Sequence, residues 1–391
     1  MLLVIAASSV AGATVHPPGA DPTGRTDSSF ALNAEIARLC AASVVFRPLA
    51  SYAISAVPAD AELDLGGGVY RIDSPLLANT SVPCTGRLRI TRGTLLAGPG
   101  LAFHGNWSFL VAVVGYMNTP ALGVTLEKLN FASNFTGGGL RVDAYHHVHV
   151  YDVNFLNFFS YGVWGSSIEG MAHDLTIERC RFTECTAGFD ECGDHRVKRA
   201  TAILLEFPDS HVRNSVITCG LVGIVNRGGS NTFHEMHIWP SCNPTATGAN
   251  LTVALRDEAG NTRISDSYID NSRLQIARYR GTTVTNTYFN GHATLELLPP
   301  ATSAAALNGA EAGMECQYWR GQMCGLLVTN NRFACGASRC GTLTHDLFIP
   351  PAADQIHVSG NHFANASAAV CSRSPGTCQG SDCADLFGAC T

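Results

Sequence analysis

A short repeated unit, clearest in residues 262–289, constrains the fold of this chain more than any other feature. Each unit has a branched apolar residue, a small polar residue, Asn or Asp, two further residues and then a large apolar residue. Two copies, 264–269 and 284–289, begin 20 residues apart. The same five-residue offset recurs at Leu126 to Phe131, Val150 to Phe155, Ile177 to Phe182, Val212 to Ile217, Phe233 to Ile238, Val328 to Phe333 and Val358 to Phe363.

The offset of five requires a bend inside each unit. Side chains of a strand alternate between its two faces, so two apolar residues five apart cannot share one face of a straight strand. Asn and Asp tolerate such a bend, and the abundance of β-branched and aromatic residues favours strands. Two short strands joined by a bend, repeated about every 20 to 30 residues, predict an all-β chain folded as a parallel β-helix. A β-sandwich or a set of antiparallel hairpins is the alternative, and nine copies of the unit weigh against it.

The charge balance excludes several kinds of partner. The 391 residues carry a net charge of −6, the only lysines are Lys128 and Lys198, and no basic run is present. Nucleic acid is therefore not an expected partner. No apolar run approaches the ~18 residues needed to span a bilayer, so we expect no membrane span. We expect one solenoid domain, because each coil contacts only its neighbours and the number of coils in a domain is therefore not limited. We also expect the protein to be a monomer.

The cysteines and glycosylation sequons favour an oxidising compartment. Fifteen cysteines are many for a cytosolic protein, and none forms a CxxC pair typical of zinc sites. The four-residue gaps from Cys180 to Cys185, Cys335 to Cys340 and Cys378 to Cys383 fit disulfide-stapled loops better. Sequons stand at Asn79, Asn106, Asn134, Asn250 and Asn365. We therefore expect a secreted or cell-wall glycoprotein.

The two ends of the chain differ from the middle. Residues 1–15 predict a signal peptide cleaved near Ala13, with a first buried strand as the alternative. Residues 16–370 predict the β-helix, and 371–391 a Cys-rich tail or cap. Within 19–43, a turn precedes a helix that begins at Asp27 or Ser28 and would cover the open first coil. Its expected apolar face consists of Phe30, Ala31, Ala34, Ile36 and Ala37.

Several stretches resemble known β-helix proteins. The opening GADPTG-x-TD and the later GGGVYRIDSPL, residues 66–76, resemble the N-terminus of pectate-lyase-superfamily proteins. Residues 137–155, 201–217, 231–240 and 262–293 resemble the divergent, quartet-type plant polygalacturonases. The resemblance covers about two thirds of the chain and implies a right-handed β-helix that acts on a polysaccharide, with pectin or another uronate-containing glycan as the substrate class. The chain departs from the classical polygalacturonase motifs N-T-D, D-D, G-H-G and R-I-K, and Leu204 stands where the quartet-type pattern has Asp.

The acid-rich segment 189–211 supplies the predicted catalytic residues. Hydrolysis of a glycosidic bond needs one carboxylic acid and one carboxylate, which lie about 6.5–9.5 Å apart in inverting enzymes. Asp194 and Asp209 are the predicted pair, with His211 relaying the proton. The alternative is a solvated loop stapled through Cys185 and Cys192. The predicted substrate-binding residues are Asp190, Arg196, Arg213, His237, Arg263 and Asp270, of which Arg196 or Arg213 would bind a substrate carboxylate with both nitrogens.

Two classes of function fit these patterns. The first is a polygalacturonase-like hydrolase, with a lyase as the less favoured enzyme. We expect no metal and no cofactor for a hydrolase, whereas a lyase would commonly use calcium. His234 and His237 do not have the spacing of a zinc helix motif. The second class is a non-catalytic β-helix that binds glycan or builds a surface, and the missing polygalacturonase motifs favour it.

Overall fold

The structure, a computed structural model, describes the following parts of the chain: 14–42, 44–48, 54–58, 61–77, 87–114, 123–143, 147–166, 174–183, 200–218, 222–239, 252–278, 281–291, 293–298, 325–334, 347–349, 356–364, 370–372 and 378–379. The predicted signal peptide and Cys-rich end lie almost wholly outside these ranges and stay predictions. None of the described helices is both long and apolar enough to cross a membrane. The chain divides into two compact units, Met1–Phe159 with Ser166–Thr176 and Ser160–Gly165 with Ile177–Thr391, here called unit 1 and unit 2.

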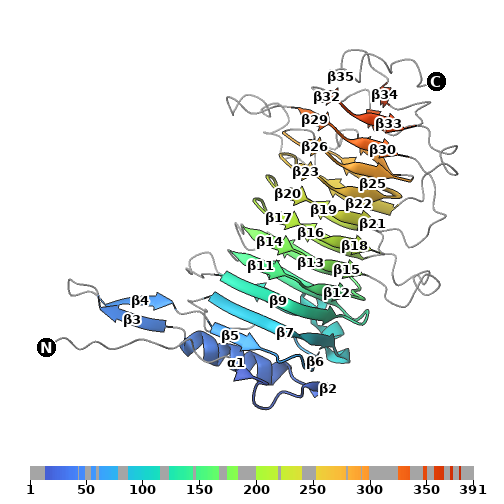
Figure 1. The fold of residues 1–391 in the computed structure, drawn as a ribbon. Coiled ribbons are helices and arrows are strands. Elements are labelled where there is room, and N and C mark those ends of the chain that lie inside the picture. The colour runs from blue at the N-terminus through green and yellow to red at the C-terminus, as the bar shows by residue number, and fades with distance from the viewer. Residues whose placement is uncertain are drawn as a thin grey trace. The chain divides into compact units, whose positions relative to one another are not determined.

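The described part of unit 1 consists of parallel strands, two helices and one antiparallel hairpin (Figure 1). Its helices are α1 (Ser29–Ala42) and the 3-10 helix η1 (Pro99–Trp107). Its parallel strands are β1 (Thr14–Val15), β2 (Thr23–Asp27), β5 (Ala61–Asp64), β6 (Val69–Ile72), β7 (Arg87–Ala97), β8 (Phe109–Val114), β9 (Gly123–Ala132), β10 (Gly138–Asp143), β11 (Val148–Tyr151) and β12 (Asn154–Leu156). Strands β3 (Val44–Pro48) and β4 (Ile54–Pro58) form an antiparallel hairpin. Strand β14 (Leu175–Glu178) has residues in both units.

The predicted helix is confirmed, but most of its predicted apolar face is wrong. Leu32, Ile36 and Leu39 are fully buried, whereas Phe30 is 86% exposed. The buried residues are four and three apart, which is the spacing of one helix face. Phe30 lies in the first turn, off that face.

The opening motif that carries the family resemblance forms the N-terminal turn. The Asp21 carboxylate accepts hydrogen bonds from the backbone N–H groups of Thr23 (2.9 Å), Arg25 (3.0 Å) and Thr26 (2.8 Å). It also accepts the hydroxyls of Thr23 and Thr26. These donors, the Thr23 hydroxyl first among them, hold the pKa of Asp21 well below its usual range. The motif therefore serves the fold.

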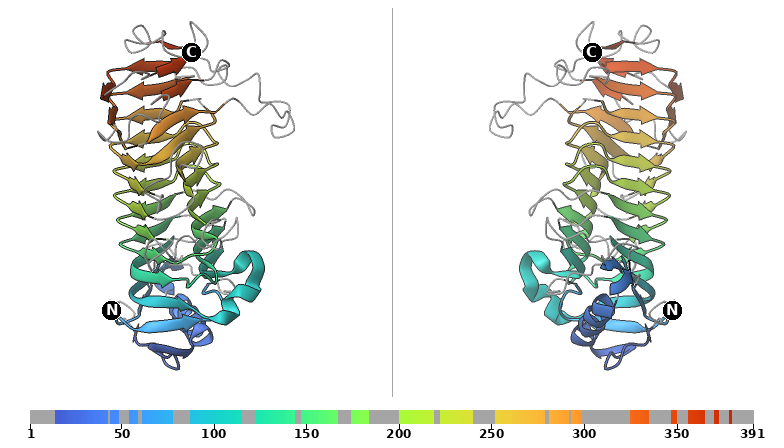
Figure 2. Two further views of the ribbon diagram at one scale, coloured as in Figure 1. Left: turned by 90° about the vertical axis from the view of Figure 1, so that its right-hand side faces the viewer. Right: turned by 90° about the vertical axis from the view of Figure 1, so that its left-hand side faces the viewer.

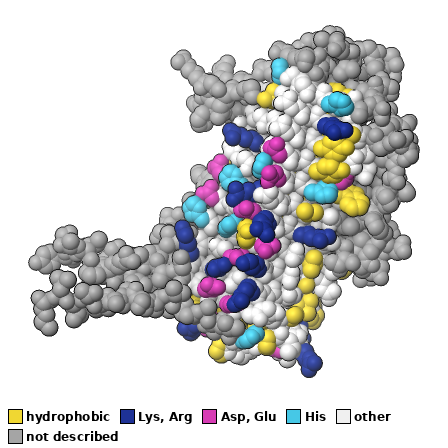
Figure 3. Space-filling view, in the orientation of Figure 1, with side chains coloured by type: hydrophobic (Ala, Val, Ile, Leu, Met, Phe, Trp, Pro, Cys, Tyr) yellow, Lys and Arg dark blue, Asp and Glu magenta, His cyan; other side chains and the backbone are white. Residues whose placement is uncertain are grey.

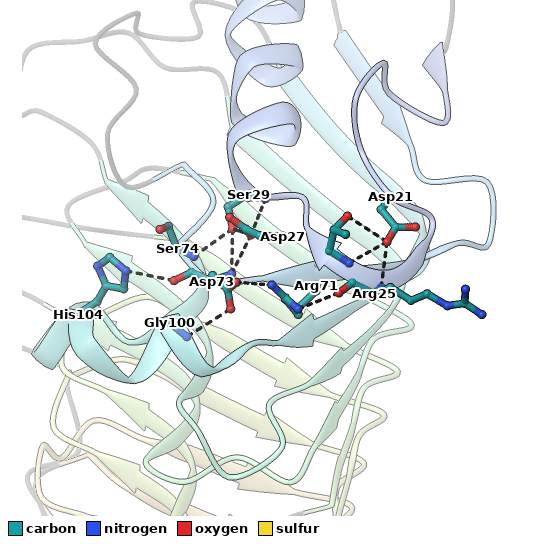
Figure 4. Close-up of polar contacts among 10 residues, drawn as sticks. Asp21, Arg25, Asp27, Ser29, Arg71, Asp73, Ser74, Gly100 and His104 are labelled. Carbon is teal, nitrogen blue, oxygen red and sulfur yellow. Dashed lines mark hydrogen bonds and ion pairs between the residues drawn. The ribbon is translucent and has the colours of Figure 1, made fainter.

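The second motif of the resemblance closes the same region (Figure 4). Asp73 accepts hydrogen bonds from Arg71 (3.0 Å) and from the N–H of Gly100 (3.2 Å). Its own N–H donates to the Ser29 hydroxyl at 2.9 Å and to Asp27 at 3.1 Å. Asp21 and Asp73, the acidic residues of the two motifs, thus stabilise the N-terminal turn and the contacts between α1, β6 and η1.

Replacing Asp21 with Asn tests the role of this carboxylate. Because the folded-state pKa of Asp21 is lowered, its stabilising contribution is present above the ordinary aspartate pKa of about 4 and is lost as the pH falls through the folded-state value. We expect Asp21→Asn to unfold at a lower urea concentration than the native chain at pH 7. The difference between the two urea midpoints should become smaller as the solution becomes strongly acidic. A difference that does not change with pH would contradict this account.

Unit 2 is a stack of three-stranded coils in which every described pairing is parallel (Figures 1 and 2). The first strand of each coil, strand A, is β17 (His211–Arg213), β20 (Thr232–His234), β23 (Arg263–Ser265), β26 (Thr283–Thr285), β29 (Leu326–Thr329) or β32 (Ile356–Ser359). The second, strand B, is β15 (Arg181–Thr183), β18 (Val216–Thr218), β21 (His237–Trp239), β24 (Tyr268–Asp270), β27 (Tyr288–Asn290), β30 (Arg332–Ala334) or β33 (His362–Ala364). The third, strand C, is β13 (Tyr161–Ser166), β16 (Thr201–Leu205), β19 (Val222–Asn226), β22 (Thr252–Asp257), β25 (Ser272–Ile276), β28 (Thr294–Leu297), β31 (Leu347–Ile349) or β34 (Val370–Ser372). The last short strand, β35 (Cys378–Gln379), pairs with β32.

The repeated unit found in the sequence is strand A, a bend and strand B. In unit 2 the bend residue between the two strands has a positive φ of 50° to 57° at Arg179, Asn214, Glu235, Asp266, Asn286 and Asn330. Asn and Asp enter this left-handed conformation at low cost, which explains their place in the motif. The predicted bend is therefore confirmed. The two apolar residues of each unit both point inward because the chain turns between them.

The core consists of these inward residues, stacked coil on coil. Ile238 pairs with Ile269, Ile269 with Phe289, and Phe289 with Phe333. All four are at most 2% exposed. The rings of Phe289 and Phe333 stack with centroids 4.5 Å apart. One further copy of the unit, with Arg92 at the bend of β7, was not recognised in the sequence.

A buried polar cluster lies at the corner that follows strand C. Asp257 is fully buried and its carboxylate accepts hydrogen bonds from Asn226 (2.8 Å), Thr262 (2.9 Å) and Thr282 (3.2 Å). Asn226 in turn accepts a bond of 2.6 Å from Asn231. Burial raises the pKa of the Asp257 carboxyl. This cluster joins successive coils where the apolar core is interrupted.

Candidate functional site

The outward side chains of unit 2 form three separate surfaces, one for each strand of the coil. Because the bend turns the chain between strands A and B, their outward residues lie on different faces. We call these the strand-A groove, the strand-B groove and the strand-C face. Figure 3 shows charged side chains along strands A and a column of hydrophobic side chains along strands B.

The strand-C face holds a cluster of carboxylates and arginines directly after the strand ends. Leu205, Asn226 and Asp257 occupy the same register position in three successive coils. The next residues, Glu206, Arg227 and Glu258, therefore follow in the same order. The Arg227 guanidinium lies 3.2 Å from Glu206 and 3.0 Å from Glu258. One cation is thus shared by two carboxylates.

Two further contacts distinguish the two glutamates. The Trp164 indole N–H donates to Glu206 at 3.0 Å. Arg256 lies 3.3 Å from Glu258, so that carboxylate has two guanidinium neighbours. The side chain of Glu206 is 21% exposed and that of Glu258 is 31% exposed. The hydrogen bonds and charges of Glu206 and Glu258 raise the pKa of Arg227 against the opposing effect of its burial.

The spacing of the coils limits how far apart the two carboxylates can lie. Backbone positions one coil apart are about 4.8 Å apart, so Glu206 and Glu258, two coils apart, start from positions about 9.6 Å apart. Both carboxylates reach toward the Arg227 guanidinium, which shortens the distance between them. Inverting glycosidases hold their carboxyl groups about 6.5–9.5 Å apart, which leaves room for a water molecule.

The strand-B groove has an aromatic row. His237, Tyr268, Tyr288 and Arg332 occupy one register position in successive coils. His237 meets the edge of Tyr268 with centroids 4.9 Å apart, and Tyr268 lies 5.0 Å from Tyr288. The Arg332 guanidinium lies over Tyr288, 5.4 Å from the ring centroid.

Asp270 lies beside this row and is 9% exposed. It accepts hydrogen bonds from His237 Nε2 at 3.0 Å and from Asn290 at 2.6 Å. Burial raises the pKa of the Tyr268 phenol, and the negative charge of Asp270 raises it further. The groove encloses about 690 Å³ and is also lined by Glu235, Met236, Trp239, Asp266, Ser267 and Asn286.

The strand-A groove is smaller, at about 410 Å³. His211 and Arg263, two coils apart, both line it. His211 Nδ1 lies 2.6 Å from the Thr232 hydroxyl. The Arg263 guanidinium has no hydrogen-bond or ion-pair partner among the described residues.

The predicted site residues do not lie together in one site. Asp190, Asp194 and Arg196 lie outside the described residues, so the proposed pair Asp194 and Asp209 stays a prediction. Asp209 is exposed, at the bend before β17, with a φ of 59°. His211 and Arg263 lie together in the strand-A groove, Arg213 is paired with Glu178 at 2.7 Å, and His237 and Asp270 lie together in the strand-B groove.

Sequence reasoning missed the residues that the structure places together on the strand-C face. Glu206 lies within the acid-rich segment 189–211 but is not among the residues predicted from it, and Glu258 lies outside that segment. Sequence reasoning also missed Tyr268 and Tyr288, although a signal was present. Both stand immediately before the large apolar residue in the two copies of the unit within 262–289.

No metal centre is apparent in the part of the chain that the structure describes. There, no group of three or more His, Cys, Asp or Glu side chains is arranged to hold an ion. The expected absence of a zinc site and the calcium of a lyase both stay predictions.

Comparisons with known proteins rest on structure. No family model matches the chain, and no curated protein matches it significantly. PfbA, a surface adhesin of Streptococcus pneumoniae, is similar with a TM-score of 0.57 and 11% identity over 88% of this chain and 83% of the adhesin. A mutant tailspike protein of E. coli bacteriophage HK620, solved with a pentasaccharide, has a TM-score of 0.50 and 11% identity over 96% of this chain and 63% of the tailspike. The A-module of mannuronan C-5 epimerase AlgE4 of Azotobacter vinelandii has a TM-score of 0.44 and 11% identity over 95% and 98%. The first two similarities, together with the stacked parallel strands, show that the chain folds as a right-handed parallel β-helix.

Proposed function

We propose that the protein is carbohydrate-active and hydrolyses a polysaccharide on its strand-C face, with Glu206 and Glu258 as the carboxylate pair. The carrying observation is that one guanidinium, that of Arg227, lies within 3.2 Å of both glutamates. Their positions two coils apart fit the separation that inversion requires. The right-handed β-helix supports the proposal, since the tailspike of the same fold was solved with a pentasaccharide.

We propose different roles for the two glutamates. Glu258 lies beside two guanidinium groups, those of Arg227 and Arg256, and we assign it the role of the carboxylate that activates water. Glu206 lies beside Arg227 and the Trp164 N–H, and we assign it the role of the acid that protonates the leaving oxygen. The Trp164 ring can pack against the apolar face of a sugar. Protonation of the leaving oxygen and attack by water then cleave the glycosidic bond.

The arginines of this face support an acidic substrate. Arg227 and Arg256 both lie at the proposed carboxylate pair, and their planar groups can bind a uronate carboxylate. This is the reason for proposing a pectin-like or other uronate-containing glycan. We propose secretion to the cell exterior or wall, on the strength of the cysteines and the five sequons.

The products of the reaction test the proposal. Incubation of the full chain with polygalacturonate is expected to release reducing ends without forming an unsaturated sugar, because hydrolysis adds water and leaves no double bond. Ultraviolet absorbance from a new carbon–carbon double bond would instead identify a lyase. Binding without any released ends, over long incubation and a panel of acidic glycans, would favour the non-catalytic alternative.

A further inference from the structure

The strand-B groove carries features that the proposed hydrolysis does not use. Its aromatic row lies on the strand after the bend, whereas Glu206 and Glu258 follow strand C. Tyr268 and Tyr288 are part of the groove lining, not of the buried core. Their rings repeat at a spacing of 5.0 Å, with His237 at 4.9 Å on one side. The result is a short aromatic row along the strand-B groove.

Hydrogen-bonding groups lie on both sides of the aromatic row. Asp270 lies along one side of it, with Asn290 and His237 fixing the carboxylate. Asp266 and Asn286 lie at the bend, where the Asn286 amide donates to Asp266 at 3.2 Å. The Trp239 indole N–H is buried and has no hydrogen-bond partner among the described residues. Rings in the middle with acceptors and donors at both edges match a chain of sugars, whose ring faces are apolar and whose edges carry hydroxyls.

The charge of the groove restricts the kind of sugar. Of its described lining residues, Glu235, Asp266 and Asp270 are acidic, and neither Arg nor Lys is among them. Arg332, which lies over the Tyr288 ring, is not among the lining residues. A polyanion would therefore meet like charges along the groove. Uncharged sugars meet no such repulsion, and carboxylates accept their hydroxyl protons.

From this geometry we infer that the strand-B groove is a second saccharide site, which binds a neutral polysaccharide chain and holds the protein on it. The site is separate in position and in ligand class from the acidic glycan proposed for the strand-C face. The inference does not depend on Glu206 and Glu258 being catalytic. It would give the protein an attachment to neutral glycan while the other face meets an acidic one.

Variants of the two tyrosines test the inference. Isothermal titration calorimetry of the full chain would use soluble β-glucan, xylan and galactomannan, with polygalacturonate as the acidic comparison. We expect at least one neutral polymer to bind, and Tyr268→Ala with Tyr288→Ala to weaken that binding about 10- to 100-fold, since both substitutions remove aromatic contact with the sugar. Tyr288→Phe keeps the ring and should bind almost as the native chain does.

Matched controls separate a site from a structural row. Tyr288→Leu keeps an apolar side chain of similar reach and should lose affinity without lowering the melting temperature. His211→Ala, in the strand-A groove, should leave neutral-glycan binding unchanged. Turnover of polygalacturonate should stay within twofold in the tyrosine variants, so failure of this inference and failure of the proposed hydrolysis give different results.

Three outcomes overturn the inference. The first is that none of the neutral polymers binds. The second is that the double alanine variant, folded by its melting curve, binds them as tightly as the native chain. The third is that the tyrosine substitutions weaken polygalacturonate binding and neutral-glycan binding equally.

Discussion

Glu206→Gln and Glu258→Gln are each expected to lower polysaccharide cleavage by about 100-fold or more, the typical contribution of a general acid or base. Glutamine keeps the length and shape of each side chain but can neither release a proton to the leaving oxygen nor take one from water. Trp164 and Arg227 can still contact the remaining carbonyl oxygen of residue 206. Initial rates of reducing-end release from polygalacturonate would measure the loss.

The same assay decides between two assignments of the carboxylate pair. Asp194→Asn and Asp209→Asn should each abolish cleavage if the pair expected from the sequence is catalytic. They should leave the rate nearly unchanged if Glu206 and Glu258 are the pair. Asp152→Asn is a suitable control, since this carboxylate lies at the bend between β11 and β12 of unit 1. Full activity of both Glu206→Gln and Glu258→Gln would rule out the strand-C proposal.

Asp257→Ala is expected to destabilise the fold by about 2–5 kcal/mol. The carboxylate is fully buried and accepts bonds from Asn226, Thr262 and Thr282, which lie at the corners that end three successive C strands, β19, β22 and β25. Alanine would leave these donors without their acceptor, and each unsatisfied buried group costs about 1–3 kcal/mol. Urea unfolding at neutral pH would measure the change.

Asp257→Asn should keep the hydrogen bonds that Asp257→Ala loses. Its amide oxygen can still accept from Asn226 and Thr262, and its N–H can donate to the Thr282 hydroxyl. Because the folded-state pKa of Asp257 is raised, its contribution is fully present below the ordinary value of about 4 and is lost as the pH rises through the folded-state pKa. We therefore expect Asp257→Asn to gain stability over the native chain as the pH is raised. Equal destabilisation by Asn and Ala at every pH would contradict this role.

Much of the coil could be predicted because its determinants are local. The bend and the two inward residues of the unit lie within six residues, as at 264–269, and each follows from side-chain chemistry alone. The periodic Val, Ile and Phe residues then fix the register of one coil on the next. Strand C was not predicted, because no comparable spacing links it to strand B.

The candidate site could not be predicted in the same way, because it depends on register over long distances. Glu206 and Glu258 are 52 residues apart in sequence, and only the pairing of β16, β19 and β22 brings them to one guanidinium. A dense run of acids in 189–211 was a more visible signal. That signal was incomplete, because Glu206 directly follows a buried strand of the scaffold, β16 (Thr201–Leu205), and does not lie in an acidic loop. Residues 190, 194 and 196 remain outside the described part of the chain.

The three-residue strands A and B have a consequence for how such a chain can change over time. In β17, β20, β21 and β26 only the middle residue is buried, and its neighbours on both sides point outward. Substitutions at outward positions usually change stability by no more than about 0.5 kcal/mol. Two of every three positions in these strands are therefore free to acquire or lose ligand contacts, while the middle position need only stay apolar. Such a scaffold can diverge almost completely in sequence and exchange one glycan specificity for another without losing its fold.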